Sequence, residues 1–124
     1  MASIVEIVSY FNSAKEQAIV WHHQVNGVGS FSAHKALEEF YEEIVELNDN
    51  LSESYAGIYG RLKGYDVHDL ADFTTIEDII SYYRGCYDWL AIERKTAPQD
   101  SWIQNQLDAY AELLGSTLYK LTLK

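Results

Sequence analysis

Apolar residues recur every three to four positions along nearly the whole chain, and this period constrains the fold more than any other feature. The longest run covers residues 32–63, where proline is absent and glycine occurs only at Gly57 and Gly60. An apolar stripe of this period is typical of an amphipathic helix, whereas a half-buried strand would alternate apolar and polar residues. No segment shows a competing strand period. The sequence therefore predicts an all-α protein with one long helix over residues 32–63.

Three further segments carry the same period. The predicted helices cover residues 3–26, 75–94 and 98–121. Gly27 and Gly29 end the first of them, because glycine commonly follows a helix C-terminus, and Pro98 suits the first turn of the last. Residues 64–73 form a connector, with one short helical turn expected over residues 66–70. A connection of about ten residues can cross from one end of a bundle to the other, which a tight turn cannot do.

Two helix starts carry the signature of a capping box, in which Ser or Thr is followed three residues later by Glu. Ser3 precedes Glu6 in this way, and Thr74 precedes Glu77. The stripe of the longest helix, which we expect to face the core, comprises Phe31, Leu37, Phe40, Tyr41, Ile44, Leu47, Leu51, Tyr55, Ile58 and Leu62.

Composition and charge favour one folded domain over residues 1–124. Hydrophobic residues make up 48% of the chain, and the net charge is −10 with only nine Lys and Arg. Nucleic-acid binding needs a positive surface that releases counterions, so this charge argues against DNA as a partner. The single cysteine, Cys86, excludes an intrachain disulfide and fits a reducing compartment. No signal-peptide or membrane-helix pattern is present, and we expect a cytoplasmic protein.

Five residues with metal-binding side chains lie between positions 22 and 53. His34 and Glu38 are four residues apart, as are Asp49 and Glu53, and His22 lies twelve residues before His34. Residues four apart lie on one face of a helix. Imidazole and carboxylate together form the ligand set of a transition-metal site for iron, manganese or zinc, rather than of a calcium loop.

The same spacing indicates that one chain cannot complete such a site. His34 and Asp49 are fifteen residues apart, which corresponds to about 22 Å along a helix. The simplest solution is an antiparallel pair of identical helices from two chains. One chain then contributes His22, His34 and Glu38 to a site, and the other contributes Asp49 and Glu53. A two-fold axis creates two such sites.

This pattern resembles the Dps family, the mini-ferritins. The family segment reads approximately H-W-N-V-x-G, then H-x-x-x-D, then D-x-x-x-E. The corresponding residues here are 22–27, then His34 with Glu38, then Asp49 with Glu53, with the same gaps between the three blocks. Glu38 stands where the family usually has Asp.

The resemblance implies both a fold and an activity. It implies a ferritin-like four-helix bundle with a long crossover connection between the second and third helices. It also implies a ferroxidase site between subunits that oxidises Fe2+ to Fe3+ with hydrogen peroxide or oxygen, for iron storage and oxidative protection, with zinc or manganese as substitute metals. The implied metal-binding and catalytic residues are His22, His34, Glu38, Asp49 and Glu53. The family's assembly is a dodecamer, so the resemblance implies a homo-oligomer that is at least an antiparallel dimer.

Two other functions fit parts of the sequence. The exposed carboxylates and the charge of −10 would suit an acidic protein that mimics DNA and occupies a DNA-binding partner without enzymatic activity. A ferritin-like bundle with a structural zinc is the other alternative, because zinc binds the same ligands more tightly than iron does. The oligomer size and the oxidant stay open at this stage.

Overall fold

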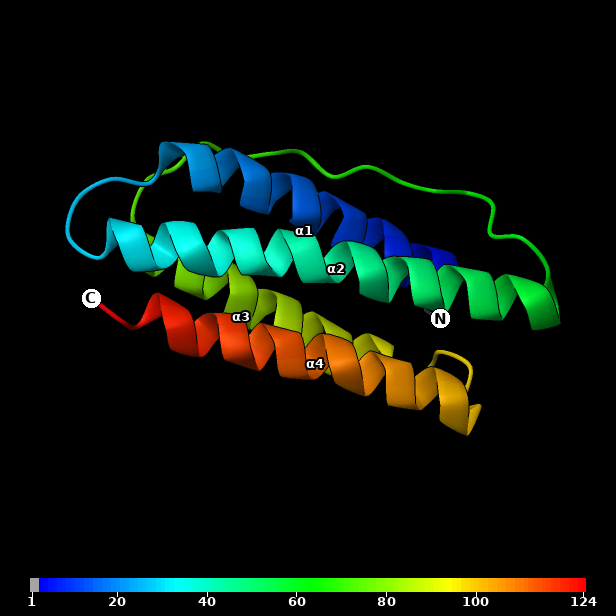
Figure 1. The fold of residues 1–124 in the computed structure, drawn as a ribbon. Coiled ribbons are helices and arrows are strands. Elements are labelled where there is room, and N and C mark those ends of the chain that lie inside the picture. The colour runs from blue at the N-terminus through cyan, green and yellow to red at the C-terminus, as the bar shows by residue number, and fades with distance from the viewer. Residues whose placement is uncertain (1–2) are drawn as a thin grey trace.

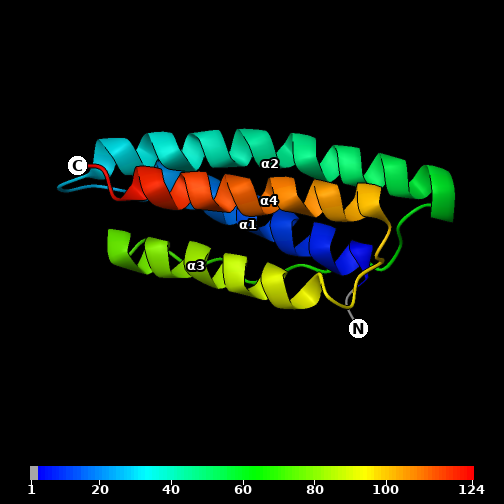
Figure 2. The ribbon, with the colours of Figure 1, turned by 90° about the horizontal axis from the view of Figure 1, so that it is seen from below.

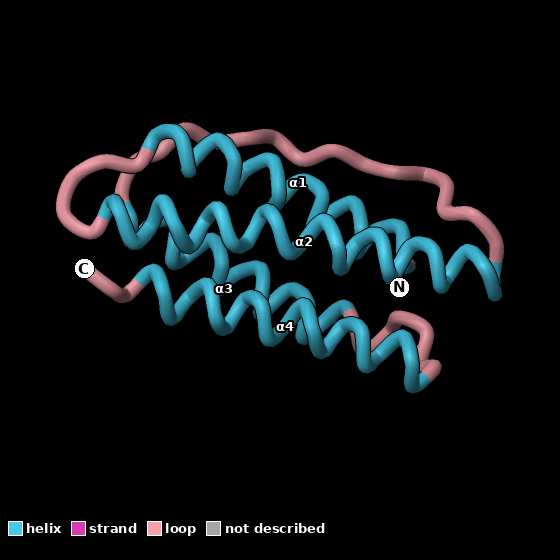
Figure 3. Tube along the Cα trace, viewed as in Figure 1, coloured by secondary structure: helices cyan, strands magenta, loops and turns pink. Residues whose placement is uncertain are grey.

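The computed structural model describes residues 3–124 and contains four helices. They are α1 (Ile4–Gln24), α2 (Ser30–Tyr59), α3 (Ile76–Glu93) and α4 (Ser101–Leu121). Within the described residues there is no strand, and loops make up the remainder (Figure 3). The prediction of an all-α protein with four helices is therefore confirmed.

The four helices run roughly along one common direction (Figures 1 and 2). α1 and α2 are antiparallel neighbours joined by a short turn, α4 packs against α2, and α3 packs against α4. α3 runs in the same direction as α2, and α4 returns antiparallel to both (Figure 1). Because α2 ends at one end of the bundle and α3 begins at the other, residues 60–75 travel the length of the molecule.

The helix starts agree with the predicted capping boxes in one case and differ in the other. The Ser3 hydroxyl accepts a hydrogen bond from the Glu6 backbone N–H at 3.3 Å, as predicted. At α3 the prediction is displaced by one residue, because Thr75 and not Thr74 is the cap. Thr75 Oγ1 accepts from the Asp78 N–H at 3.1 Å, while the Thr74 hydroxyl donates to the Asp78 carboxylate.

The ends of α2 and the start of α4 also differ from the prediction. α2 ends before Gly60, whose φ of 100° lies in a region that side-chain-bearing residues rarely adopt. The helix is therefore shorter than the predicted 32–63 at its C-terminal end. α4 begins after Asp100, whose carbonyl accepts the first helical N–H groups from Ile103 and Gln104. Pro98 accordingly precedes α4 and does not occupy its first turn.

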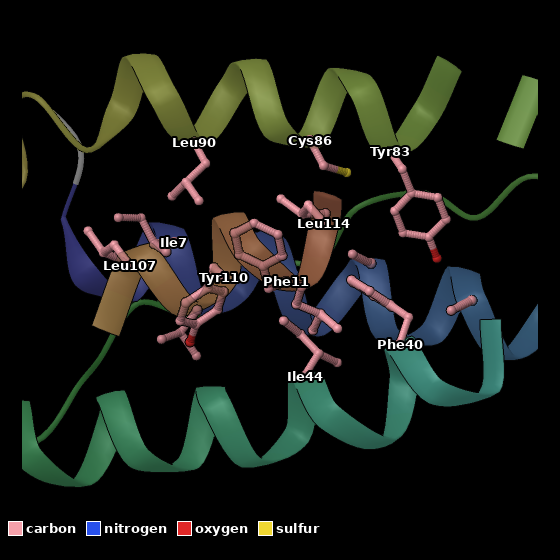
Figure 4. Close-up of a cluster of buried hydrophobic side chains, with 14 of the residues drawn as sticks. Ile7, Phe11, Phe40, Ile44, Tyr83, Cys86, Leu90, Leu107, Tyr110 and Leu114 are labelled. Atoms are coloured by element: carbon pink, nitrogen blue, oxygen red, sulfur yellow. The ribbon is translucent and has the colours of Figure 1, made fainter. Parts of the chain in front are cut away.

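All four helices contribute side chains to one hydrophobic core (Figure 4). Figure 4 shows Phe40 and Ile44 of α2 pointing toward Phe11 of α1 and Tyr110 of α4, with Cys86 of α3 on the opposite side. Each of these side chains is essentially inaccessible to solvent. Burial of so many large apolar groups, each stabilising by roughly 1.5–3 kcal/mol, is what holds the helices together.

Two residues expected in this core are exposed instead. Phe31 is 76% exposed and Ile58 is 69% exposed. Phe31 is nine positions from Phe40, and nine steps of about 100° place it on the opposite side of α2. Ile58 lies in the last turns of α2, which extend past the ends of the neighbouring helices (Figures 1 and 2). Both predictions were therefore wrong for geometric reasons.

The connector, residues 60–75, lies along α1 in an extended conformation (Figure 1). The Ser9 hydroxyl accepts a hydrogen bond from the Asp66 N–H at 3.0 Å, and the Ser13 hydroxyl accepts from the His68 N–H at 3.1 Å. The helical turn predicted over residues 66–70 does not form. These backbone N–H groups bond to α1, so they cannot form the bonds of a helix.

Two glutamines of α1 continue the same row of contacts. Gln17 donates from Nε2 to the Ala71 carbonyl at 2.8 Å and accepts from the Ala71 N–H at 2.7 Å. Gln24 accepts from the Phe73 N–H at 2.7 Å and donates to the Asp72 carboxylate at 3.0 Å. Residues four apart share one face of a helix. α1 therefore has a polar face that satisfies the connector backbone, in addition to its apolar face toward the core.

We predict that Gln17→Ala loosens the connector. The substitution removes both hydrogen bonds to Ala71, so the free energy of unfolding should fall by about 1–3 kcal/mol. Trypsin should also cleave faster at Arg61 and Lys63, which lie in the connector. Urea titration and limited proteolysis measure the two effects. Asn105→Ala, on an exposed position of α4, is the control. Equal proteolysis of the two variants would contradict the role assigned to Gln17.

Aromatic side chains and the only cysteine fill the contact between α1 and α3. Tyr10 of α1 stacks on Trp89 of α3 with ring centroids 3.8 Å apart, and Trp21 meets Tyr82 edge-on at 5.0 Å. Cys86 lies between these pairs, against the hydroxyls of Tyr10 and Tyr82. Burial raises the pKa of the Cys86 thiol to about 11. Burial likewise raises the pKa of Tyr10 and Tyr82.

We predict that the protein loses stability in alkaline solution. Because the pKa of Cys86 is higher in the folded chain than its ordinary 9.0, its contribution is fully present below pH 9.0 and is lost as the pH rises toward about 11. The buried tyrosines act in the same direction. Urea unfolding at increasing pH measures the decline, which should be shallower in Cys86→Ala. An identical pH dependence in the two proteins would contradict the assignment to Cys86.

Candidate functional site

His22 and His34 form a reciprocal pair that joins the end of α1 to the start of α2. His22 Nδ1 lies 2.9 Å from the His34 carbonyl oxygen, and His34 Nδ1 lies 2.9 Å from the His22 carbonyl oxygen. The two rings stack with centroids 3.6 Å apart and an interplanar angle of 22°. Each histidine is therefore held by the backbone of the other, across the α1–α2 turn.

These contacts fix the orientation of both rings and the tautomer of each imidazole. A carbonyl oxygen only accepts hydrogen bonds, so each Nδ1 must carry a proton. In the neutral imidazole this leaves the lone pair on Nε2. A histidine whose Nδ1–H is bonded to a backbone carbonyl, and whose Nε2 is free to coordinate, has the arrangement found in metal-binding histidines. The structure thus places two potential nitrogen ligands side by side.

The surroundings of the histidine pair combine burial with negative charge. His22 is only 8% exposed, and the Tyr41 ring packs edge-on against it at 5.4 Å. Glu38 lies one helical turn after His34, with its carboxylate 3.3 Å from the Lys35 ammonium. Partial burial, followed by the nearby Glu38 and Glu42 carboxylates, raises the pKa of the Tyr41 hydroxyl. The structure therefore brings His22 and His34 together, while the recorded partner of Glu38 is Lys35.

Asp49 and Glu53 lie elsewhere on α2 and are exposed. Fifteen helical residues separate Asp49 from His34, which is about 22 Å. No group of three or more His, Cys, Asp and Glu within residues 3–124 is close enough to hold a metal ion, and this applies to His22, His34 and Glu38 as well. A single chain brings together the two histidines and leaves the second acid pair apart. The shared site therefore stays a prediction that requires a second copy of the chain.

The two halves of the predicted site are connected by one exposed stripe of α2. Its side chains belong to the half-buried Glu38 and to the exposed Glu42, Val45, Glu46, Asp49 and Glu53. Val45, which is 40% exposed, is the only apolar member. This stripe is the surface that a second copy would have to cover if the two halves were to meet.

A buried polar network beneath Asp49 was not predicted from the sequence. Asn48 donates to Asn12 of α1 at 2.8 Å and accepts from the Tyr110 hydroxyl of α4 at 2.7 Å. Burial, followed by the Asp49 carboxylate, raises the pKa of Tyr110. The sequence feature that could have indicated this network is an asparagine one position after Leu47, on the core-facing side of α2. The network fixes α2 against two neighbours at the position where Asp49 projects into solvent.

Comparison with known protein families gives a match over most of the chain. Residues 27–121 match the model of DUF5856, a family of unknown function. The chain belongs to this family. Neither the curated proteins nor the solved structures contain a match to it. The match covers His34, Glu38, Asp49 and Glu53 but begins after His22.

Membership of DUF5856 does not specify an activity, so the chemistry must be argued from the site. None of the helices within residues 3–124 combines the length and the hydrophobicity required to cross a lipid bilayer.

We predict that the His22–His34 pair stabilises the fold independently of any metal. His34→Ala removes one Nδ1 donor and the ring stacking, and should lower the free energy of unfolding by about 1–3 kcal/mol in the presence of a chelator. His34→Asn keeps a nitrogen donor near the Nδ1 position and should recover part of that loss. Urea unfolding of the three proteins makes the comparison. Equal stability of His34→Ala and the natural chain would contradict a structural role for the pair.

Proposed function

We propose that this protein is a Dps-like mini-ferritin that binds and oxidises Fe(II) at sites shared between two copies of the chain. The observation that carries the proposal is the stacked pair of His22 and His34, whose Nδ1–H groups are both engaged by backbone carbonyls. This arrangement leaves Nε2 of each ring to serve as a ligand.

The fold supports the proposal. A ferritin-like bundle requires the second and third helices to run parallel, and a long crossover to connect them. Here α2 and α3 run in the same direction, and residues 60–75 pass along α1 between them (Figure 1). The helix order and directions therefore agree with a ferritin-like arrangement.

The spacing on α2 supports a two-fold arrangement. When two copies of α2 pack antiparallel so that His34 of one faces Glu53 of the other, Glu38 faces Asp49 in the same register. Each step forward along one helix is then matched by a step backward along the other. The two-fold axis passes between these pairs and generates two equal sites. His22, held against His34, completes each site.

The ligand set suits the oxidation of ferrous iron. Imidazole nitrogen binds Fe(II), while carboxylate oxygen favours the harder ferric product. Two Fe(II) ions give one electron each to hydrogen peroxide, which takes up two protons and forms two molecules of water. In this scheme iron is the substrate, the histidines and carboxylates hold it, and the ferric ions leave for storage. The acidic stripe of α2 attracts cations toward the site.

We predict that subunit mixing distinguishes a shared site from a single-chain site. His34→Asn and Asp49→Asn should each abolish rapid Fe(II) oxidation by peroxide. Mixed after dissociation and reassociation, they should recover about one quarter of the natural activity, because half of the dimers are mixed and each has one intact site. Stopped-flow absorbance of the ferric product measures the rate. Glu46→Gln, in the same acidic stripe but outside the ligand set, is the matched control and should remain active.

The outcomes separate the proposed function from its alternatives. Undiminished oxidation in both His34→Asn and Asp49→Asn would end the iron proposal. Tight zinc binding without iron oxidation, lost in the same two variants, would favour a structural zinc. No metal binding, together with salt-sensitive binding to a basic protein, would favour an acidic protein that mimics DNA.

A further inference from the structure

Phe31 is a large apolar side chain on the side of α2 that faces away from the core. It is 76% exposed, three residues before His34. A single exposed apolar residue is common on protein surfaces and has no meaning by itself. The other end of the same helix, however, contains a hollow in which such a side chain would fit.

That hollow lies between the last turns of α2 and the start of the connector. Its volume is about 270 Å³. Its lining residues are Ser52, Glu53, Ala56, Arg61, Leu62 and Tyr65. Ala56, Leu62 and Tyr65 supply apolar walls, and a cavity of about 150 Å³ already accommodates a benzene ring. The hollow is therefore large enough for the aromatic ring of a phenylalanine.

The register of the proposed site relates the exposed side chain to the hollow. Phe31 lies three residues before His34, and Ala56 lies three residues after Glu53. The antiparallel pairing that places His34 opposite Glu53 therefore also places Phe31 opposite Ala56. Ala56 is 25 residues after Phe31, and 25 steps of about 100° return it to nearly the same side of α2. Both ends of the helix thus present complementary features toward one direction.

We propose that Phe31 of each copy inserts into the hollow beside Ala56 of the other copy, and that this contact sets the register of the dimer. The inference rests on the proposed function, because that function supplies the register. It identifies a second copy of this chain as the occupant of the hollow. Phe31 is then a positioning residue, which brings the histidines of one copy to the acids of the other without contacting the metal.

The shape of two packed helices explains why a large residue belongs at the ends. Antiparallel helices that cross at about 20° separate progressively away from the crossing point. Phe31 is about 19 Å from the centre of this pairing, where the axes are displaced sideways by about 6–7 Å and their separation grows from about 9 Å to about 11 Å. Near the crossing, where the helices are closest, the smaller Val45 is the apolar residue. Large apolar side chains at the ends would fill the wider gap.

The charges favour contact between the two copies at the ends of the paired α2 helices more than at their centre. Lys35 lies beside Glu53 of a second copy in this register, so opposite charges meet near each Phe31. Toward the centre, Glu38 meets Asp49, and these like charges repel until a cation binds between them. The apolar contact at each end therefore supplies attraction that the acidic stripe lacks, and it does so without metal.

The test is a disulfide that only two copies can form. In a Cys86→Ala background, Phe31→Cys and Ala56→Cys are introduced together, and the protein is oxidised with diamide in the presence of a chelator. The two positions are about 37 Å apart along one helix, so a bond within a chain is impossible. We expect a covalent dimer on non-reducing gels. The control pair combines Ala56→Cys with Tyr119→Cys, since Tyr119 is also exposed, at 66%, but lies on α4.

A second measurement follows association without cysteines. Phe31→Ala should raise the dimer dissociation constant at least about tenfold by light scattering. Ile92→Ala, which truncates a 63% exposed residue of α3, should leave it unchanged. Absence of the covalent dimer, or equal cross-linking of both cysteine pairs, would overturn the proposal. A specific covalent dimer that fails to oxidise iron would support the register and refute the iron chemistry. Subunit complementation without the specific cross-link would support the iron chemistry and refute the contact proposed for Phe31.

Discussion

The parallel arrangement of α2 and α3 is the constraint on which the rest of the structure depends. It obliges the chain to travel the whole length of the bundle without forming a helix, and so leaves a row of backbone groups in need of hydrogen bonds. Ser9, Ser13, Gln17 and Gln24 supply them from one face of α1. α1 therefore connects two layers of the molecule, with its apolar face in the core and its polar face under the connector.

The histidine pair works by the same principle at the end of α1. Both Nδ1 atoms bond to backbone carbonyls across the α1–α2 turn, so the pair stabilises a chain reversal as well as orienting its own rings. In the proposed function this matters because the rings are in position before any metal arrives. The acids have no comparable fixation, since Asp49 and Glu53 are exposed on α2. A binding site with one half held by backbone contacts and one half exposed to solvent would suit an ion that has to enter, react and leave.

The sequence predicted the helices well because each was encoded locally, by an apolar period and by residues that start or stop a helix. It failed where distant residues decide the local structure. Residues 66–70 are extended because of Ser9 and Ser13, more than fifty positions away, which no local pattern reveals. Phe31 was included in the core stripe of the longest helix, although its angle relative to Phe40 excludes it.

The candidate site, too, was predicted from the sequence only in part. The intervals between His22, His34, Glu38, Asp49 and Glu53 indicated which residues share a face, and the described chain brings His22 and His34 together. The reciprocal bonding of the histidines was not foreseeable, because it depends on how tightly the turn between α1 and α2 closes. The polar network around Asn48 was likewise hidden, since its partners Asn12 and Tyr110 belong to other helices.

The way in which the connector is held has a consequence for how freely the two segments can change. At Asp66, His68, Ala71 and Phe73, α1 contacts backbone N–H groups, which every residue except proline possesses. These four hydrogen bonds therefore make no demand on the side chains of the connector, although Phe73 also packs against the core. Each contacting residue of α1, in contrast, must place an oxygen at one particular distance from its own helix. Mutations should therefore be tolerated better in the connector than at the four contacting positions of α1.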